Sequence, residues 1–110
     1  MKILLGNAFS LNMVNTENMV NIRVMKLENY EVRPMIAGFG GIDSCVGHED
    51  TAAVFSQILG IDVPVNRATI SLFRGDQMIV GQYIGPRLPE GAKTLPQGAE
   101  VNWLLVSILK

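Results

Sequence analysis

The residue best suited to chemistry in this sequence is its single histidine, His48, which stands within the run Gly-His-Glu-Asp-Thr. An imidazole titrates near neutral pH, so it can give or take a proton during a reaction. A surface or capping histidine is the commoner outcome for a lone histidine in a small domain. His48 is therefore a candidate general acid or base whose role depends on what surrounds it.

The single cysteine, Cys45, stands three residues before His48. If one helix carried both, the two side chains would share a face, and a cysteine–histidine pair is conceivable. No third residue that would orient such a pair can be identified, so we favour a small buried side chain as the role of Cys45. One cysteine cannot form an internal disulfide, which fits a reducing compartment. One histidine with scattered carboxylates supplies no metal-ligand cluster, and no metal is expected.

Three central arginines, Arg67, Arg74 and Arg87, are the candidates for binding an anion. A guanidinium group suits bidentate contacts with phosphate, although each arginine taken singly is most often solvated. The sequence has no Gly-x-x-x-x-Gly-Lys loop, and the glycines at 38–41 lack the spacing of a dinucleotide fingerprint, so no cofactor is expected. Nine basic and ten acidic residues give a net charge of −1. Attraction to duplex nucleic acid is therefore not expected, and an anionic ligand must be bound locally.

The elements that would position these residues predict a single α/β domain. The chain has 110 residues, of which 48% are apolar and 17% charged, and this supports one domain with a proper core. Residues 2–6 have the short apolar pattern of a buried strand, residues 19–25 alternate as a half-buried strand does, and residues 101–108 form a last strand. We expect one mixed β-sheet with a helix packed against it.

A helix ending at Leu59 is expected to carry His48 in its first turn. Asp43 or Ser44 can cap its start, and Gly60 can end it. A helix of this kind needs an apolar face to pack on the sheet. The residues that supply this face are Ala52, Phe55 and Leu59.

Other segments give weaker or more local signals. Residues 29–37 are expected to form either a short helix or an irregular segment, and both alternatives stay open because Pro34 in the middle would break a helix. The β-rich runs 68–73 and 78–83 flank the turn sequence Arg-Gly-Asp-Gln at 74–77, which predicts a β-hairpin. We interpret the Arg-Gly-Asp tripeptide as plain turn chemistry rather than as an adhesion motif.

Two further segments bear on the site and on location. Residues 85–98 contain three prolines and three glycines, which predicts an ordered loop. The apolar run after Lys2 is broken at once by Gly6, so it is too short for a signal peptide or a membrane span. We expect a protein of the cytoplasm with no membrane partner.

Four blocks of the sequence, taken together, resemble one protein family. The blocks are Asn7-Ala8-Phe9-Ser10-Leu11-Asn12-Met13, Gly47-His48-x-x-Thr51-Ala52, Asn66-Arg67 and Arg87-Leu88-x-Glu90-Gly91. Their order and spacing, and the chain length, are similar to those of the small viral and prophage ring nucleases that act as anti-CRISPR proteins against type III systems. The resemblance covers nearly the whole chain.

This resemblance implies a homodimeric mixed α/β protein that binds cyclic tetra-adenylate, the second messenger of type III CRISPR defence. It implies cleavage of the ring to linear di-adenylates with 2′,3′-cyclic phosphate ends, with His48 as the catalytic histidine and Glu90 as an acidic residue near the scissile site. The ligand-binding positions that it implies are Asn7, Ser10, Arg67, Gln82 and Arg87, with the register at Gln82 differing by one residue. Archaeal viral members have a longer helical segment where this chain has a short proline-bearing loop at 91–101.

The chemistry agrees with the residues present. An RNA-type phosphodiester can be cleaved by its own 2′-hydroxyl, which needs neither a metal nor a protein nucleophile. The protein must align the attacking oxygen, stabilise charge on the phosphoryl oxygens and protonate the departing 5′ oxygen. Arginines and a helix N-terminus suit the second task, and His48 suits the third. A two-fold symmetric dimer would present the same patch to equivalent phosphates of a ring.

Two other functions stay open at the level of sequence. A protein of the same fold can sequester a cyclic nucleotide without cutting it, and analysis of products after long incubation separates this protein from an enzyme. A nucleic-acid-binding regulator is favoured only if basic residues cluster on one face of a dimer.

Overall fold

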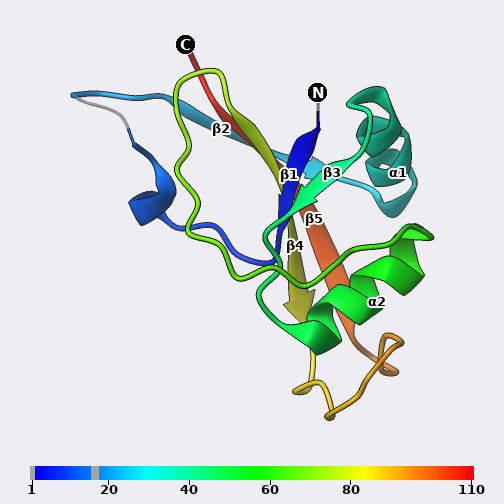
Figure 1. Cartoon of the computed structure of the whole chain (residues 1–110). Coiled ribbons are helices and arrows are strands. Elements are labelled where there is room, and N and C mark those ends of the chain that lie inside the picture. The colour runs from blue at the N-terminus through cyan, green and yellow to red at the C-terminus, as the bar shows by residue number, and fades with distance from the viewer. Residues whose placement is uncertain (1, 16–17) are drawn as a thin grey trace.

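A five-stranded mixed sheet forms the centre of the molecule (Figure 1). The computed structural model describes residues 2–15 and 18–110. Across the sheet the strand order is β2-β5-β4-β1-β3. The elements are β1 (Ile3–Gly6), the 3-10 helix η1 (Leu11–Met13), β2 (Ile22–Leu27), α1 (Asn29–Gly38), β3 (Ile42–Ser44), α2 (Glu49–Leu59), β4 (Gln77–Ile84) and β5 (Glu100–Ile108). Among the described residues no helix has the length and apolar character needed to cross a membrane.

Three parallel strands deliver the site residues to one end of the sheet. β1 runs parallel to both β3 and β4, whereas β5 is antiparallel to β4 and β2. The carboxyl ends of β1, β3 and β4 therefore lie at the same edge, where open α/β sheets commonly bind ligands. Asn7 follows β1, His48 follows β3 and Arg87 follows β4, so residues far apart in sequence converge there.

Both helices pack on the same face of the sheet. Their apolar stripes meet the inward-facing residues of β1, β4 and β5 in one continuous core. The largest side chains of this core are fully buried, as expected where helix and sheet close on each other. The residues concerned include Val32 and Ile36 of α1, Ala52, Phe55 and Leu59 of α2, and Leu5, Ile79, Trp103 and Leu105 of the strands. The α/β class with a mixed sheet and helical packing is thus confirmed.

A glycine in β4 lets α2 approach the sheet closely. The rings of Phe55 and Trp103 lie 4.9 Å apart between centroids and are tilted by 55°. A Cβ atom at Gly81 would lie 2.6 Å from a ring carbon of each, closer than any real contact allows. Both rings are fully buried and have no room to move. This contact fixes the position of α2 on the sheet, and with it the position of His48 at the start of the helix.

Irregular segments cover part of the opposite face. Leu72 donates its N–H to the carbonyl of Met13 at 2.7 Å and accepts from the N–H of Asn15 at 2.8 Å, so two long loops are joined over the sheet. The buried residues of this second core are Leu72, Met78, Val80, Val106 and Ile108. The rest of this face is open, and Val24 and Ile84 there are 55% and 45% exposed.

The helix that carries the site begins later than predicted. Residues 42–44 form β3, because they pair with residues 3–5 of β1. The Ser44 hydroxyl donates to the Pro64 carbonyl at 2.6 Å rather than capping a helix, so neither Asp43 nor Ser44 has the predicted capping role. His48 is itself the N-cap residue of α2. The predicted end at Gly60 is confirmed, since this glycine has the left-handed φ of 67° typical of a helix end.

The predicted hairpin over residues 68–83 is wrong. Within residues 68–73 the structure has a single isolated bridge, between Leu72 and Val14. β4 pairs with β1 on one side and β5 on the other, which leaves no edge for a hairpin partner. The turn itself is present, because Asp76 accepts a hydrogen bond from the Phe73 N–H at 2.8 Å.

The open question at residues 29–37 is settled in favour of a helix. Its start is fixed by a capping box in which the Glu28 N–H donates to the Glu31 carboxylate at 2.8 Å. Pro34 cannot donate to the carbonyl of Tyr30, but Tyr30 is an exposed residue, where water can replace the missing partner. The neighbouring strand also differs slightly from the prediction, since it spans 22–27 rather than 19–25.

Candidate functional site

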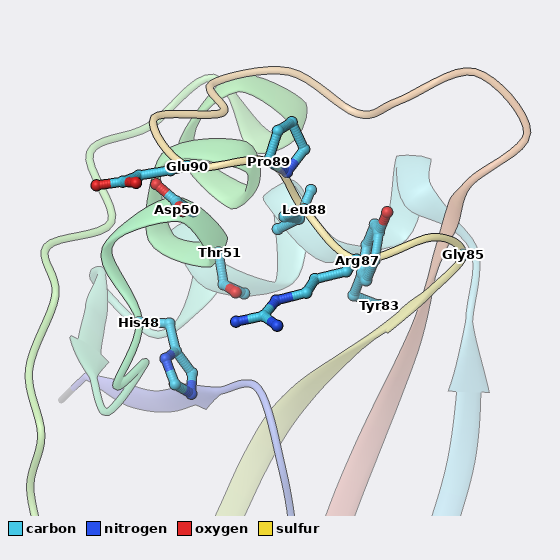
Figure 2. Close-up of a pocket in the computed structure, with 9 residues that line it drawn as sticks. All are labelled: His48, Asp50, Thr51, Tyr83, Gly85, Arg87, Leu88, Pro89 and Glu90. Atoms are coloured by element: carbon cyan, nitrogen blue, oxygen red, sulfur yellow. The ribbon is translucent and has the colours of Figure 1, made fainter.

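Two hollows at the carboxyl end of the parallel strands meet at His48. The larger one, about 780 Å³, is called here the Arg87 hollow, and its lining is shown in Figure 2. It is lined by His48, Asp50, Thr51, Tyr83, Gly85, Arg87, Leu88, Pro89 and Glu90. The second, about 550 Å³, is called the Arg67 hollow. It is lined by Asn7, Ala8, Cys45, Gly47, His48, Arg67, Ala68 and Thr69.

His48 is the residue common to both hollows. Its backbone is extended, and its carbonyl accepts the first helical hydrogen bond from Ala52 at 3.0 Å. The His48 side chain does not cap α2, and among the described residues no side chain accepts a hydrogen bond from the first N–H groups of the helix. These groups and the positive end of the helix dipole make the surroundings of the imidazole attractive to an anion.

Arg87 enters the site from the loop after β4. Figure 2 shows its guanidinium group extended toward His48, with the side chain of Thr51 above it. Within the described parts of the chain, Arg87 takes part in no hydrogen bond or ion pair. Its five N–H donors are therefore available to a ligand in the Arg87 hollow.

Glu90 belongs to the same hollow but faces differently. Figure 2 shows its carboxylate pointing away from both His48 and Arg87. Arg87 and Glu90 therefore lie on the same loop, but only the side chain of Arg87 points toward the imidazole of His48. As arranged here, Glu90 lies at the rim of the hollow.

Arg67 is held beside His48 from the other side. Its Nε–H donates to the carbonyl of Gly47 at 2.8 Å. The preceding residue, Asn66, donates its side-chain amide to the carbonyl of Ser44 and its backbone N–H to that of Val46, both at 2.8 Å. These bonds tie the Asn-Arg pair to the segment between β3 and α2. The terminal guanidinium nitrogens of Arg67 stay available for an anion.

Cys45 has a structural environment. It lies in the segment before α2, so the predicted arrangement of Cys45 and His48 on one helix face is wrong. Its thiol donates to the carbonyl of Leu5 at 3.4 Å, and burial raises the pKa of the thiol to about 11. A thiol with this pKa is protonated at neutral pH and is a poor nucleophile. The favoured interpretation, a small buried side chain, holds in part, because Cys45 is half-buried and lines the Arg67 hollow.

Two predicted ligand-binding residues lie outside both hollows. Ser10 is exposed and precedes η1 on the loop that begins with Asn7. Gln82 is exposed in β4 and alternates with Gly81, so it lies on the sheet face opposite the helices. Asn7, by contrast, lines the Arg67 hollow as the motif suggests.

Three polar residues that line the Arg87 hollow, Asp50, Thr51 and Tyr83, were not predicted as site residues. Thr51 stands three positions after His48, which is the spacing of neighbours on a helix, and this signal was available in the sequence. Asp50 and Tyr83 line the hollow only because the loop after β4 folds back toward α2. No local sequence pattern predicts this path of the loop. In the part of the chain that the structure describes, no three histidine, cysteine or carboxylate groups are grouped so that they could hold a metal ion.

Comparison with known proteins relates this chain to a protein family and to a solved structure. A family model described as STIV B116-like matches residues 3–100. The chain belongs to the STIV B116-like family. A solved structure of this kind, B116 of Sulfolobus turreted icosahedral virus, is similar to the chain with a TM-score of 0.79 and 25% sequence identity, over 97% of this chain and 99% of that one. No curated protein matches the chain. Both hollows are formed by residues within the region that matches the STIV B116-like model.

Proposed function

We propose that this protein is a ring nuclease, a metal-independent phosphodiesterase that binds cyclic tetra-adenylate and cuts it to linear di-adenylates, thereby switching off type III CRISPR signalling. One observation carries the proposal: each of the four sequence blocks contributes at least one residue to the two hollows that meet at His48. The similarity to a viral protein agrees with the viral and prophage origin of the family that these blocks resemble.

The arrangement suits cleavage by the 2′-hydroxyl of the substrate. This oxygen attacks the adjacent phosphorus and loses its proton to solvent water, the bond from phosphorus to the 5′ oxygen breaks, and a 2′,3′-cyclic phosphate forms. His48, in its protonated state, gives the 5′ oxygen a proton as it leaves. Arg87 on one side, Arg67 on the other and the first N–H groups of α2 stabilise charge on the phosphoryl oxygens.

We infer that two copies of the chain act on one ring. The Arg87 hollow has the size of a site for a drug-sized ligand, which is smaller than four linked nucleotides. A two-fold axis through the ring would place one His48 at each of two opposite phosphates, and two such cuts yield two di-adenylates. The open part of the sheet face, which carries the exposed side chains of Val24 and Ile84, offers apolar surface for a second copy.

Light scattering tests this arrangement. We expect a particle of about twice the chain mass of 12.0 kDa, both with and without the ligand. A stable monomer that cleaves the ring at the full rate would refute the proposed dimer, while leaving the chemistry at His48 intact.

Cleavage is expected to continue in excess chelator. The route through the 2′-hydroxyl needs no metal, and the sequence has one histidine and one cysteine with no ligand cluster around them. The test incubates labelled cyclic tetra-adenylate with the protein and EDTA and identifies the products by mass spectrometry. Loss of activity that is restored by adding one divalent metal would contradict this mechanism.

Cys45→Ser is expected to be nearly silent in catalysis. The thiol is protonated at neutral pH, and its hydrogen bond to the Leu5 carbonyl can be kept by a hydroxyl. Single-turnover cleavage by the variant should stay within about twofold of the wild type, a difference of roughly 0.4 kcal/mol. An inactive but well-folded Cys45→Ser protein would move the chemistry from His48 to the cysteine.

A further inference from the structure

The segment that carries Arg87 folds as an Ω-loop over residues 85–99. Its two ends touch, because a Cβ atom on Gly85 would lie 2.6 Å from the Cβ of Ala99. Close to these two ends, the hydroxyl of Tyr83 in β4 donates a hydrogen bond to the carbonyl of Pro86. The ends of the loop are therefore fixed to the sheet, whereas its tip needs a separate contact to hold it in place.

A hydrogen bond to α2 supplies such a contact. The N–H of Gly91 donates to Oδ1 of Asp50 at 3.1 Å, and among the described residues this is the only hydrogen bond between the loop and α2. Asp50 lies in the first turn of α2, two residues after His48. Gly91 has a φ of +79°, which glycine adopts without strain, so the amide is presented by a backbone shape that other residues rarely take.

The charge of Asp50 makes its position unexpected. It lines the Arg87 hollow, and a carboxylate there repels the phosphate that the proposed function brings to this place. Glu49, its neighbour in the first turn, is exposed, its side chain makes no hydrogen bond within the described residues, and it lines neither hollow. The distinguishing property of Asp50 is thus its bond to the loop.

We infer that Asp50 is a positioning residue, whose carboxylate latches the 85–99 loop to the start of α2 and so holds Arg87 beside His48. The latch stands on the geometry alone, whereas its effect on ligand binding rests on the proposed function. Asp50→Ala removes both the charge and the acceptor. Asp50→Asn removes the charge and keeps an acceptor oxygen, and Glu49→Ala removes a first-turn charge and leaves the latch intact.

The first test needs no ligand. Trypsin can cut the loop after Arg87 and after Lys93, and we expect Asp50→Ala to be cut there about fivefold faster than the wild type, as the loss of one partly exposed hydrogen bond predicts. Asp50→Asn and Glu49→Ala should be cut at close to the wild-type rate. Equal cutting of all four proteins would overturn the latch. In the wild-type protein, rapid hydrogen exchange of the Gly91 amide would overturn it as well, whether or not Asp50→Ala folds.

The second test asks whether the latch acts through Arg87. We expect Asp50→Ala to bind cyclic tetra-adenylate about fivefold more weakly, Asp50→Asn to bind at least as tightly as the wild type, and Asp50→Ala to add no further loss in an Arg87→Ala background. Additive losses would overturn the positioning role. A wild-type protein that binds no cyclic tetra-adenylate would overturn the proposed function, and the trypsin result would still decide the latch.

Discussion

Replacing His48 by alanine is expected to slow single-turnover cleavage of cyclic tetra-adenylate by about 10²- to 10⁴-fold. The imidazole acts on the leaving 5′ oxygen, where charge appears only in the transition state, so the dissociation constant should change little. The side chain is exposed and does not cap α2, so its removal should not disturb the fold. Rapid-quench cleavage with enzyme in excess, beside a binding titration, measures both quantities.

Two comparisons make the His48 result interpretable. Glu49→Ala changes the next residue of the same helix start and should cleave at the wild-type rate, since Glu49 lines neither hollow. Thermal unfolding of both variants should match that of the wild type. A folded His48→Ala protein with full activity would remove His48 from the mechanism.

Replacing Arg87 by alanine is expected to impair both binding and cleavage. Its guanidinium group contacts a phosphate that is already present in the bound ring, so its loss raises the dissociation constant as well as lowering the rate. One hydrogen-bonded charge pair corresponds to about 10- to 100-fold in affinity. The affinity and cleavage rate of Arg87→Lys should fall between those of the wild type and those of Arg87→Ala, because lysine keeps the charge and loses the planar fork of the guanidinium group.

The matched control for Arg87 is Arg23→Ala. Arg23 is an exposed arginine of β2 that lines neither hollow, so its removal changes the net charge by the same amount without touching the site. If the two alanine variants weakened binding equally, the effect of Arg87 would be general electrostatics rather than a contact. A loss of affinity confined to Arg87→Ala, and reduced at high salt, is the expected result.

The sequence predicted those elements whose signals are local. The apolar run at 2–6, the last strand at 101–108 and the helix end at Gly60 depend on neighbouring residues alone, and all three are present. The start of α2 and the hairpin depended on pairing between distant segments. Residues 42–44 join β1 instead of a helix, and β4 has β5 as its antiparallel partner, so local propensity was overridden in both places.

The site residues that could be predicted are those that belong to recognisable sequence motifs. His48, Arg67 and Arg87 belong to three of the four short blocks, and the structure brings them to adjoining hollows because three parallel strands end at one edge. Ser10 and Gln82 lie outside these hollows, since a motif states neither how a loop such as the one carrying Ser10 folds nor which face of a sheet a strand residue such as Gln82 occupies. The bond from Gly91 to Asp50 joins two segments 41 positions apart, and only the folded loop reveals it.

The most direct test of the central claim is a time course with labelled cyclic tetra-adenylate in large excess over the protein, without added metal. We predict that the whole substrate is converted to linear di-adenylates with 2′,3′-cyclic phosphate ends, and that His48→Ala protein binds the ring without converting it. Tight binding by the wild-type protein with the ring recovered intact after long incubation would contradict the account and would show a sequestering protein instead.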